Sequence, residues 1–145
     1  MPDPVLESAG KSGGHIPIGK IKIALLILLA MLFTYSGLMH FLHPQPFLKI
    51  MPEYLPGHQF LVSLSGIFEI LGAVFLLIPK TRRYAGAAMI LLLIAVFPAN
   101  INMAMRKIDF GWIPEYALWL RLPFQFVLLW AVWWSASMGR KLERT

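Results

Sequence analysis

The chain has 145 residues, of which 58% are hydrophobic and only 14% are charged. Soluble domains carry about 25% charged residues, so this composition indicates an integral membrane protein with a single domain. The formal net charge of +6 does not predict a nucleic-acid partner, because the basic residues flank long apolar runs and are typical of a topology signal. The absence of cysteine excludes disulfide exchange, thiolate nucleophiles, iron–sulfur ligation and cysteine-zinc sites.

Four apolar runs, each long enough to cross a bilayer as a helix, predict an all-α, polytopic membrane protein with a four-transmembrane-helix bundle. The expected spans are 21–41, 60–78, 84–105 and 116–138, within a transmembrane domain at 20–138. Residues 1–19 are rich in proline and glycine and predict a disordered tail, whereas residues 139–145 form a basic tail.

The connections between the spans differ in character. The segment from His43 to His58 contains four prolines but stays apolar, which predicts an interfacial loop with a short amphipathic turn. The connection from Pro79 to Arg83 is short, so the spans on either side of it should be antiparallel neighbours.

A proline lies inside the third expected span. Pro98 cannot donate a backbone hydrogen bond and frees the carbonyl of Ile94, so a kink is expected there. Because lipid offers no donor, we expect this region to face the bundle interior, with Asn100 turned inward.

The lysines and arginines predict the orientation. An even number of spans places both termini and the second loop on one face of the membrane, with nine basic residues there and three in the opposite loops, Arg121 being counted as intramembrane. This bias predicts that both termini lie in the cytoplasm. The nine residues are Lys11, Lys20, Lys22, Lys80, Arg82, Arg83, Arg140, Lys141 and Arg144, and the three are Lys49, Arg106 and Lys107.

One carboxylate falls near the centre of the second span. A charge at that depth costs about 3 kcal/mol, so Glu69 should be paired, protonated or facing water. Helical spacing places Ser65 and Gly72 on the same side as Glu69. That side is small and polar, so a neighbouring helix can approach it closely and supply a partner.

With this topology, polar residues from all four spans share the outer half of the membrane. They are the candidates for a ligand pocket: His40, Glu69, Asn100, Arg121 and Gln125. Two interpretations remain open. In the first, Glu69 and Arg121 form a structural ion pair, linked directly or through Asn100, Gln125 or water. In the second, the cluster is an outward-open pocket that binds a polar head group or relays protons.

No metal site is expected. His40 and His43 can face together at a spacing of three, but Pro44 follows at once and no inward-facing third ligand is evident. No residue is assigned a catalytic role.

Several short motifs resemble those of the DoxX family of small membrane proteins. The first runs from Gly37 through His40 and His43-Pro44 to Phe47 and the segment 52–56, and the others are Ser65-Gly66 with Glu69 and Gly72, Pro79 with Arg82-Arg83, Phe97 to Asn100, and Leu120 to Gln125. The resemblance covers residues 36–136. It implies a four-helix bundle in the bacterial cytoplasmic membrane, and some relatives are associated with quinone-linked sulfur oxidation or with membrane oxidoreductase complexes. Since this chain lacks cysteine, a thiol-based role cannot carry over.

Two functions are therefore expected. The first is an accessory subunit of a membrane oxidoreductase that binds a quinone-like amphiphile, with Glu69 exchanging its proton, no intrinsic cofactor, and electrons supplied by a redox partner protein. The alternative is a non-enzymatic scaffold, assembly factor or small permease-like protein whose polar cluster only holds the helices together. In either case the protein is expected in the lipid bilayer. Its expected protein partner is a redox protein or a second copy of the same chain.

Overall fold

The computed structural model describes residues 18–111 and 113–137, and this part of the chain is all-α. Its helices are α1 (Ile18–Leu42), α2 (Gln45–Ile50), α3 (His58–Leu77), α4 (Arg82–Met105) and α5 (Glu115–Ala136). All but α2 are long and apolar enough to span a membrane, so the protein is a multi-pass membrane protein.

The four expected spans correspond to α1, α3, α4 and α5 with small shifts at their ends. The largest shift is at the start, where α1 begins at Ile18, so residues 18 and 19 belong to a helix and not to the predicted tail. The rest of that tail, and the basic tail at 139–145, lie outside the described residues. The amphipathic turn predicted in the first loop is the short helix α2.

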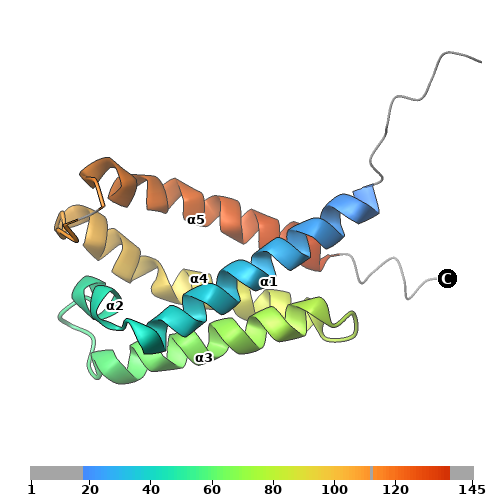
Figure 1. The fold of residues 1–145 in the computed structure, drawn as a ribbon, viewed down its shortest axis with the longest axis horizontal. Helices are drawn as coiled ribbons and strands as arrows, with labels where there is room; N and C mark the ends of the chain where they lie inside the picture. The colour runs from blue at the N-terminus through green and yellow to red at the C-terminus, as the bar shows by residue number, and fades with distance from the viewer. Residues whose placement is uncertain (1–17, 112, 138–145) are drawn as a thin grey trace, which may run out of the picture.

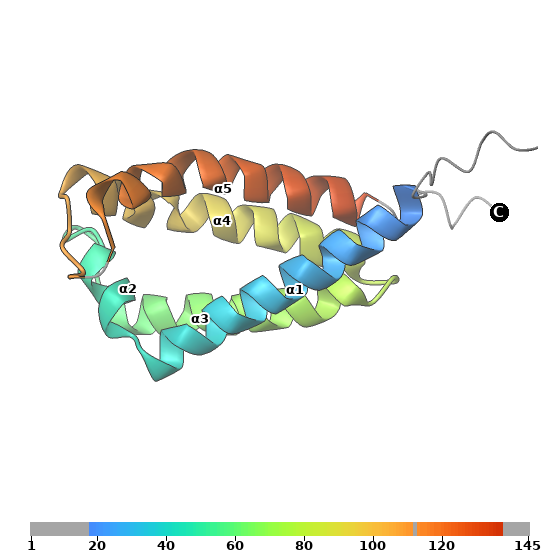
Figure 2. The same ribbon diagram turned by 45° about the horizontal axis from the view of Figure 1, so that its top comes forward.

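The helices form an antiparallel bundle with two distinct ends (Figure 1). The start of α1, the α3–α4 connection and the end of α5 lie at one end, called here the terminal end. The opposite end, called here the loop end, holds α2 and the α4–α5 connection. Figure 2 shows that α1 crosses the bundle diagonally, lying along α3 at the loop end and reaching α5 at the terminal end. Which end faces the cytoplasm stays a prediction.

Two apolar clusters hold the bundle together. The larger one joins α1, α3, α4 and α5 around the fully buried Leu76, Met89 and Val132. The smaller one lies at the loop end, where Ile50 packs with Met103 and Leu118 and so attaches α2 to α4 and α5. The outer surface is apolar as well, with large exposed side chains such as Leu28, Phe68, Leu91 and Val127, which suits a lipid environment.

The connection between α3 and α4 closes the end of α3. The last carbonyls of a helix have no partner within it, and an unpaired carbonyl is costly away from water. The buried Arg82 donates from Nε to the Leu76 carbonyl at 3.0 Å and from Nη2 to the Leu77 carbonyl at 3.1 Å. Thr81 Oγ1 donates to the Phe75 carbonyl at 2.9 Å. Arg82 therefore has a structural role.

The surroundings of Pro98 differ in part from the prediction. The helix α4 continues through Pro98, and Ile94 and Pro98 both lie on the exposed face, so the expectation that they face the interior is wrong. The reason is the helical period. Ile94 and Pro98 are four residues apart and share the exposed face, whereas Leu93 and Asn100 are seven apart and share the inward face. Asn100 does turn inward, as predicted, and it contacts Gln125 on α5.

Candidate functional site

The helices α1 and α3 touch at two glycines. A Cβ atom added to Gly66 would lie 2.9 Å from the Gly37 carbonyl oxygen, and one added to Gly37 would lie 2.8 Å from the Gly66 carbonyl oxygen. Such distances leave no room for a side chain, so the two backbones are in direct contact. The sequence predicted a close approach on the side of Ser65, Glu69 and Gly72. The backbone contact is instead at Gly66, and Gly72 packs against Met89 of α4.

One turn beyond this crossing, each helix contributes a buried ionisable side chain. His40 follows Gly37 by three residues and is 7% exposed, and Glu69 follows Gly66 by three residues and is 9% exposed. Because α1 and α3 run in opposite directions, the two residues flank the glycine contact, with His40 against Gly66 and Glu69 against Gly37. His40 Nδ1 lies 3.8 Å from Glu69 Oε2. We call these two residues the His40–Glu69 site.

The hydrogen bonding of His40 defines its tautomer. Nδ1 lies 2.8 Å from the backbone carbonyl oxygen of Ser36, which can only accept, so Nδ1 carries a hydrogen. In the neutral ring, Nε2 is then left with a lone pair. Phe47 of α2 stacks on the imidazole, with ring centroids 3.8 Å apart and planes 25° apart. The short helix α2 therefore covers one face of the histidine.

Glu69 has an unused hydrogen-bonding atom. Its Oε2 is buried and has no hydrogen-bond partner among the described residues, because 3.8 Å to His40 is too long for a hydrogen bond. Leaving such an atom unsatisfied costs about 1–3 kcal/mol. The oxygen can accept a hydrogen bond from a ligand O–H or N–H group, or donate one when the carboxyl group is protonated.

A second polar group joins α4 and α5. Asn100 Nδ2 donates to Gln125 Oε1, and Gln125 Nε2 donates to the backbone carbonyl of Leu93. Both ends of the Gln125 amide are therefore used, and the side chain is 4% exposed. The cavity beside Gln125, of about 100 Å³, is lined otherwise by apolar residues of α4 and α5. This network is suited to holding two helices together.

Arg121 belongs to neither group. Its side chain is exposed, and its Nη1 donates to Met103 Sδ at 3.8 Å. Among the described residues Glu69 lies beside His40 and forms no ion pair with Arg121, so the direct Glu69–Arg121 pair predicted from the sequence is wrong. The five candidate residues are divided into the His40–Glu69 site, the Asn100–Gln125 network and the separate Arg121.

Sequence reasoning also missed how α2 is held over the site. Asn102 Nδ2 donates to the Ile50 carbonyl at 2.9 Å, and Arg106 Nη1 donates to Glu53 Oε1 at 2.8 Å. Both bonds attach the α2 region to the end of α4. The hydrogen bond and positive charge of Arg106 hold the pKa of Glu53 below its ordinary value.

The two helix-spaced motifs, Gly-x-x-His in α1 and Gly-x-x-Glu in α3, are the signal that could have identified the crossing of α1 and α3.

In residues 18–111 and 113–137, no group of three or more histidine, aspartate and glutamate side chains is arranged to hold a metal ion. No curated protein and no solved structure matches this chain. One family model, described as a domain of unknown function (DUF8561), matches residues 29–136, which include all of the contacts described above. The chain therefore belongs to the DUF8561 family of unknown function.

Proposed function

We propose that the protein is a DoxX-like accessory subunit of a membrane oxidoreductase in the bacterial cytoplasmic membrane, and that its His40–Glu69 site binds the head group of a quinone-like amphiphile. The observation that carries this proposal is the unpartnered Oε2 of Glu69, in a side chain that is only 9% exposed. An ionisable group at this depth in a bundle is a candidate for function.

The chemistry of the pair suits such a ligand. A quinol hydroxyl can donate to Glu69 Oε2, and the lone pair of His40 Nε2 can accept a second proton. Oxidation of a bound quinol releases two electrons and two protons, and the reverse reduction of a quinone consumes them. Glu69 and His40 take up the two protons in the first direction and return them in the second, while a partner oxidoreductase takes up or supplies the two electrons.

Access to the site depends on α2. Phe47 covers His40, and the cluster around Ile50 keeps α2 on the loop end of the bundle. An amphiphile is favoured over a water-soluble ligand because the outer faces of α1 and α3 are apolar.

The test is the binding of a short-chain ubiquinone analogue to the purified full chain in mild detergent. Binding is measured by the quenching of tryptophan fluorescence. Loss of a hydrogen bond to a charged group costs about 1.5–3 kcal/mol, so Glu69→Gln should weaken binding by roughly ten- to a hundredfold. The matched control is Glu53→Gln, which removes an exposed carboxylate at the loop end and should leave binding unchanged. Equal binding by the Glu69→Gln variant and the unaltered protein would contradict the proposal.

The alternative, a non-enzymatic scaffold, assembly factor or small permease-like protein, is favoured by the Asn100–Gln125 network, in which both ends of the Gln125 amide are used between α4 and α5. Under this alternative the His40–Glu69 site only packs α1 against α3. Since uncompensated buried charges are destabilising, Glu69→Gln should then raise stability, and no quinone should bind.

A further inference from the structure

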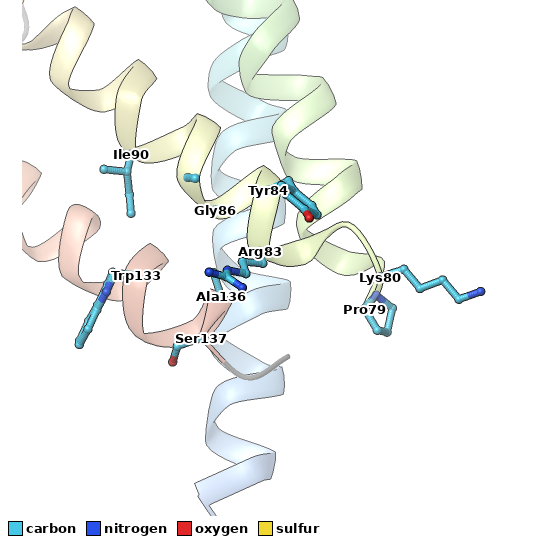
Figure 3. A pocket seen from close by; sticks show the side chains of 10 residues that line it. Pro79, Lys80, Arg83, Tyr84, Gly86, Ile90, Trp133, Ala136 and Ser137 are labelled. Carbon is cyan, nitrogen blue, oxygen red and sulfur yellow. The ribbon is translucent and has the colours of Figure 1, made fainter. Parts of the chain in front are cut away.

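A cavity of about 280 Å³ lies at the terminal end of the bundle, between the start of α4 and the end of α5 (Figure 3). It lies far along the helices from the His40–Glu69 site, and none of its lining residues belongs to that site. The lining combines basic, hydroxyl-bearing, aromatic and small residues: Pro79, Lys80, Arg83, Tyr84, Gly86, Ala87, Ile90, Trp133, Ala136 and Ser137.

Two adjacent arginines have different surroundings here. Arg82 is buried, and its guanidinium is used by the carbonyls at the end of α3. Arg83 is exposed, lines the cavity, and points toward the end of α5, where Ala136 and Ser137 lie (Figure 3). Lys80 extends from the α3–α4 connection away from α5, at the rim of the cavity.

This end of the bundle has no acidic counterpart within the described residues. The described part of the chain contains four acidic side chains. Glu53, Asp109 and Glu115 lie at the loop end, and Glu69 lies in the middle of α3. The charges of Lys80 and Arg83 are therefore not balanced by an acidic side chain of residues 18–111 or 113–137. An anion is the complementary occupant.

The shape of the cavity follows from a close helix contact. A Cβ atom added to Gly86 would collide with Ala136, so α4 and α5 approach closely at that point and limit the cavity on one side. Ile90 and Trp133 extend the lining toward the apolar middle of the bundle, while Arg83 and Ser137 lie where the helices start and end. The cavity thus has a basic part at the membrane boundary and an apolar part directed into the membrane.

From this arrangement we propose that the cavity binds an anionic phospholipid, with its phosphate at Arg83, Lys80 at the rim, and its glycerol and acyl region against Trp133 and Ile90. Basic pockets between transmembrane helices recognise such head groups, and tryptophan is favoured at the level of the head groups. A cavity of this size is close to the lower limit of small-molecule sites, roughly 300 Å³, so it accommodates a head group while the acyl chains stay in the bilayer.

The test uses the purified full chain and dioleoylphosphatidylglycerol, with binding followed by native mass spectrometry. A basic residue near the membrane surface contributes about fivefold to the binding of an anionic lipid, which corresponds to ~1 kcal/mol. Arg83→Gln should therefore reduce the affinity about fivefold, and Arg83→Lys should restore most of it. Lys49→Gln is the matched control, because it removes an exposed positive charge from α2 at the loop end.

Two further measurements distinguish the alternatives. Phosphatidylcholine should bind more weakly than phosphatidylglycerol, and inorganic phosphate should not displace the lipid, because it cannot use the apolar part of the cavity. If Arg83→Gln failed to fold, Lys80→Gln, which removes the second basic residue of the lining, should still weaken lipid binding. Equal binding of the two lipids, full displacement by phosphate, or equal losses in Arg83→Gln and Lys49→Gln would overturn the proposal.

Discussion

The contact between Gly37 and Gly66 predicts a large effect of a single methyl group. In a Gly66→Ala variant, the new Cβ would lie 2.8 Å from His40 Cβ and 2.9 Å from both the Gly37 carbonyl oxygen and Phe41 Cε2. Ordinary contacts begin at 3.4 Å, so α1 and α3 must separate by about 0.5 Å. Two of the three obstacles are a backbone oxygen and a Cβ atom, which cannot move unless the helix moves.

The expected loss of stability follows from two opposing terms. Overpacking a well-packed contact costs about 1–3 kcal/mol, whereas replacing glycine by alanine inside a helix contributes up to ~1 kcal/mol in its favour. The net loss for Gly66→Ala should be about 1–2 kcal/mol. At Gly72 the same change meets the flexible thioether of Met89, so its loss should be smaller.

The assay is unfolding in mixed micelles with increasing dodecyl sulfate, followed by the loss of helical circular dichroism. Gly19→Ala is the matched control, because no atom lies within 4 Å of the position of its new Cβ. That variant should be as stable as the unaltered protein or slightly more so. If Gly66→Ala were as stable as Gly19→Ala, α1 and α3 would not be in backbone contact and the account of the crossing would be refuted.

Two other predictions concern the amide network and the loop end. Gln125→Ala leaves Asn100 and the Leu93 carbonyl without their partner, and should lower the free energy of unfolding by about 0.6–2 kcal/mol. The control Gln59→Ala, at an exposed position of α3, should have no effect in the same assay. Arg106 holds the pKa of Glu53 below its ordinary value, so their pairing contributes stability above the pKa of the unfolded chain and loses it as the pH falls through the folded pKa. Arg106→Gln should therefore raise the pKa of Glu53 in a carboxyl NMR titration, and an unchanged titration would contradict the pairing.

The four long helices could be predicted from the sequence because each is specified by local information. A continuous apolar run of bilayer length has no other stable form in lipid than a helix, so the spans agree with α1, α3, α4 and α5 to within a few residues. The start of α1 was placed too late because Ile18 and Gly19 precede Lys20, and the charge of Lys20 was used to mark the boundary. The packing of α2 could not be predicted, since it depends on contacts with other helices, of Ile50 with Asn102 of α4 and of Phe47 with His40 of α1.

The partner of Glu69 was assigned incorrectly because charge was considered without knowing which helices touch. Arg121 has the complementary charge and lies on the same side of α5 as Gln125, but its side chain is exposed and contacts Met103 of α4. His40 becomes the neighbour of Glu69 because the glycine contact brings α1 and α3 together one turn away. Small residues at equal spacing from a polar residue in two helices are thus a better indicator of a buried pair than opposite charge.

The ion pairs at the loop end have a consequence for how the chain is inserted into its membrane. Arg106 is paired with Glu53 at 2.8 Å and Lys107 with Glu115 at 2.9 Å, and Asp109 offsets the charge of Lys49, so this end is electrically neutral when Arg121 is counted within the span. The terminal end carries Lys20, Lys22, Lys80, Arg82 and Arg83 without acidic residues among those described. Moving one elementary charge across a membrane against a potential of 100 mV costs about 2.3 kcal/mol. We therefore expect the neutral loop end to be the one that is translocated, carrying its own counter-charges across, while the potential retains the positive terminal end on the side where the chain is synthesised.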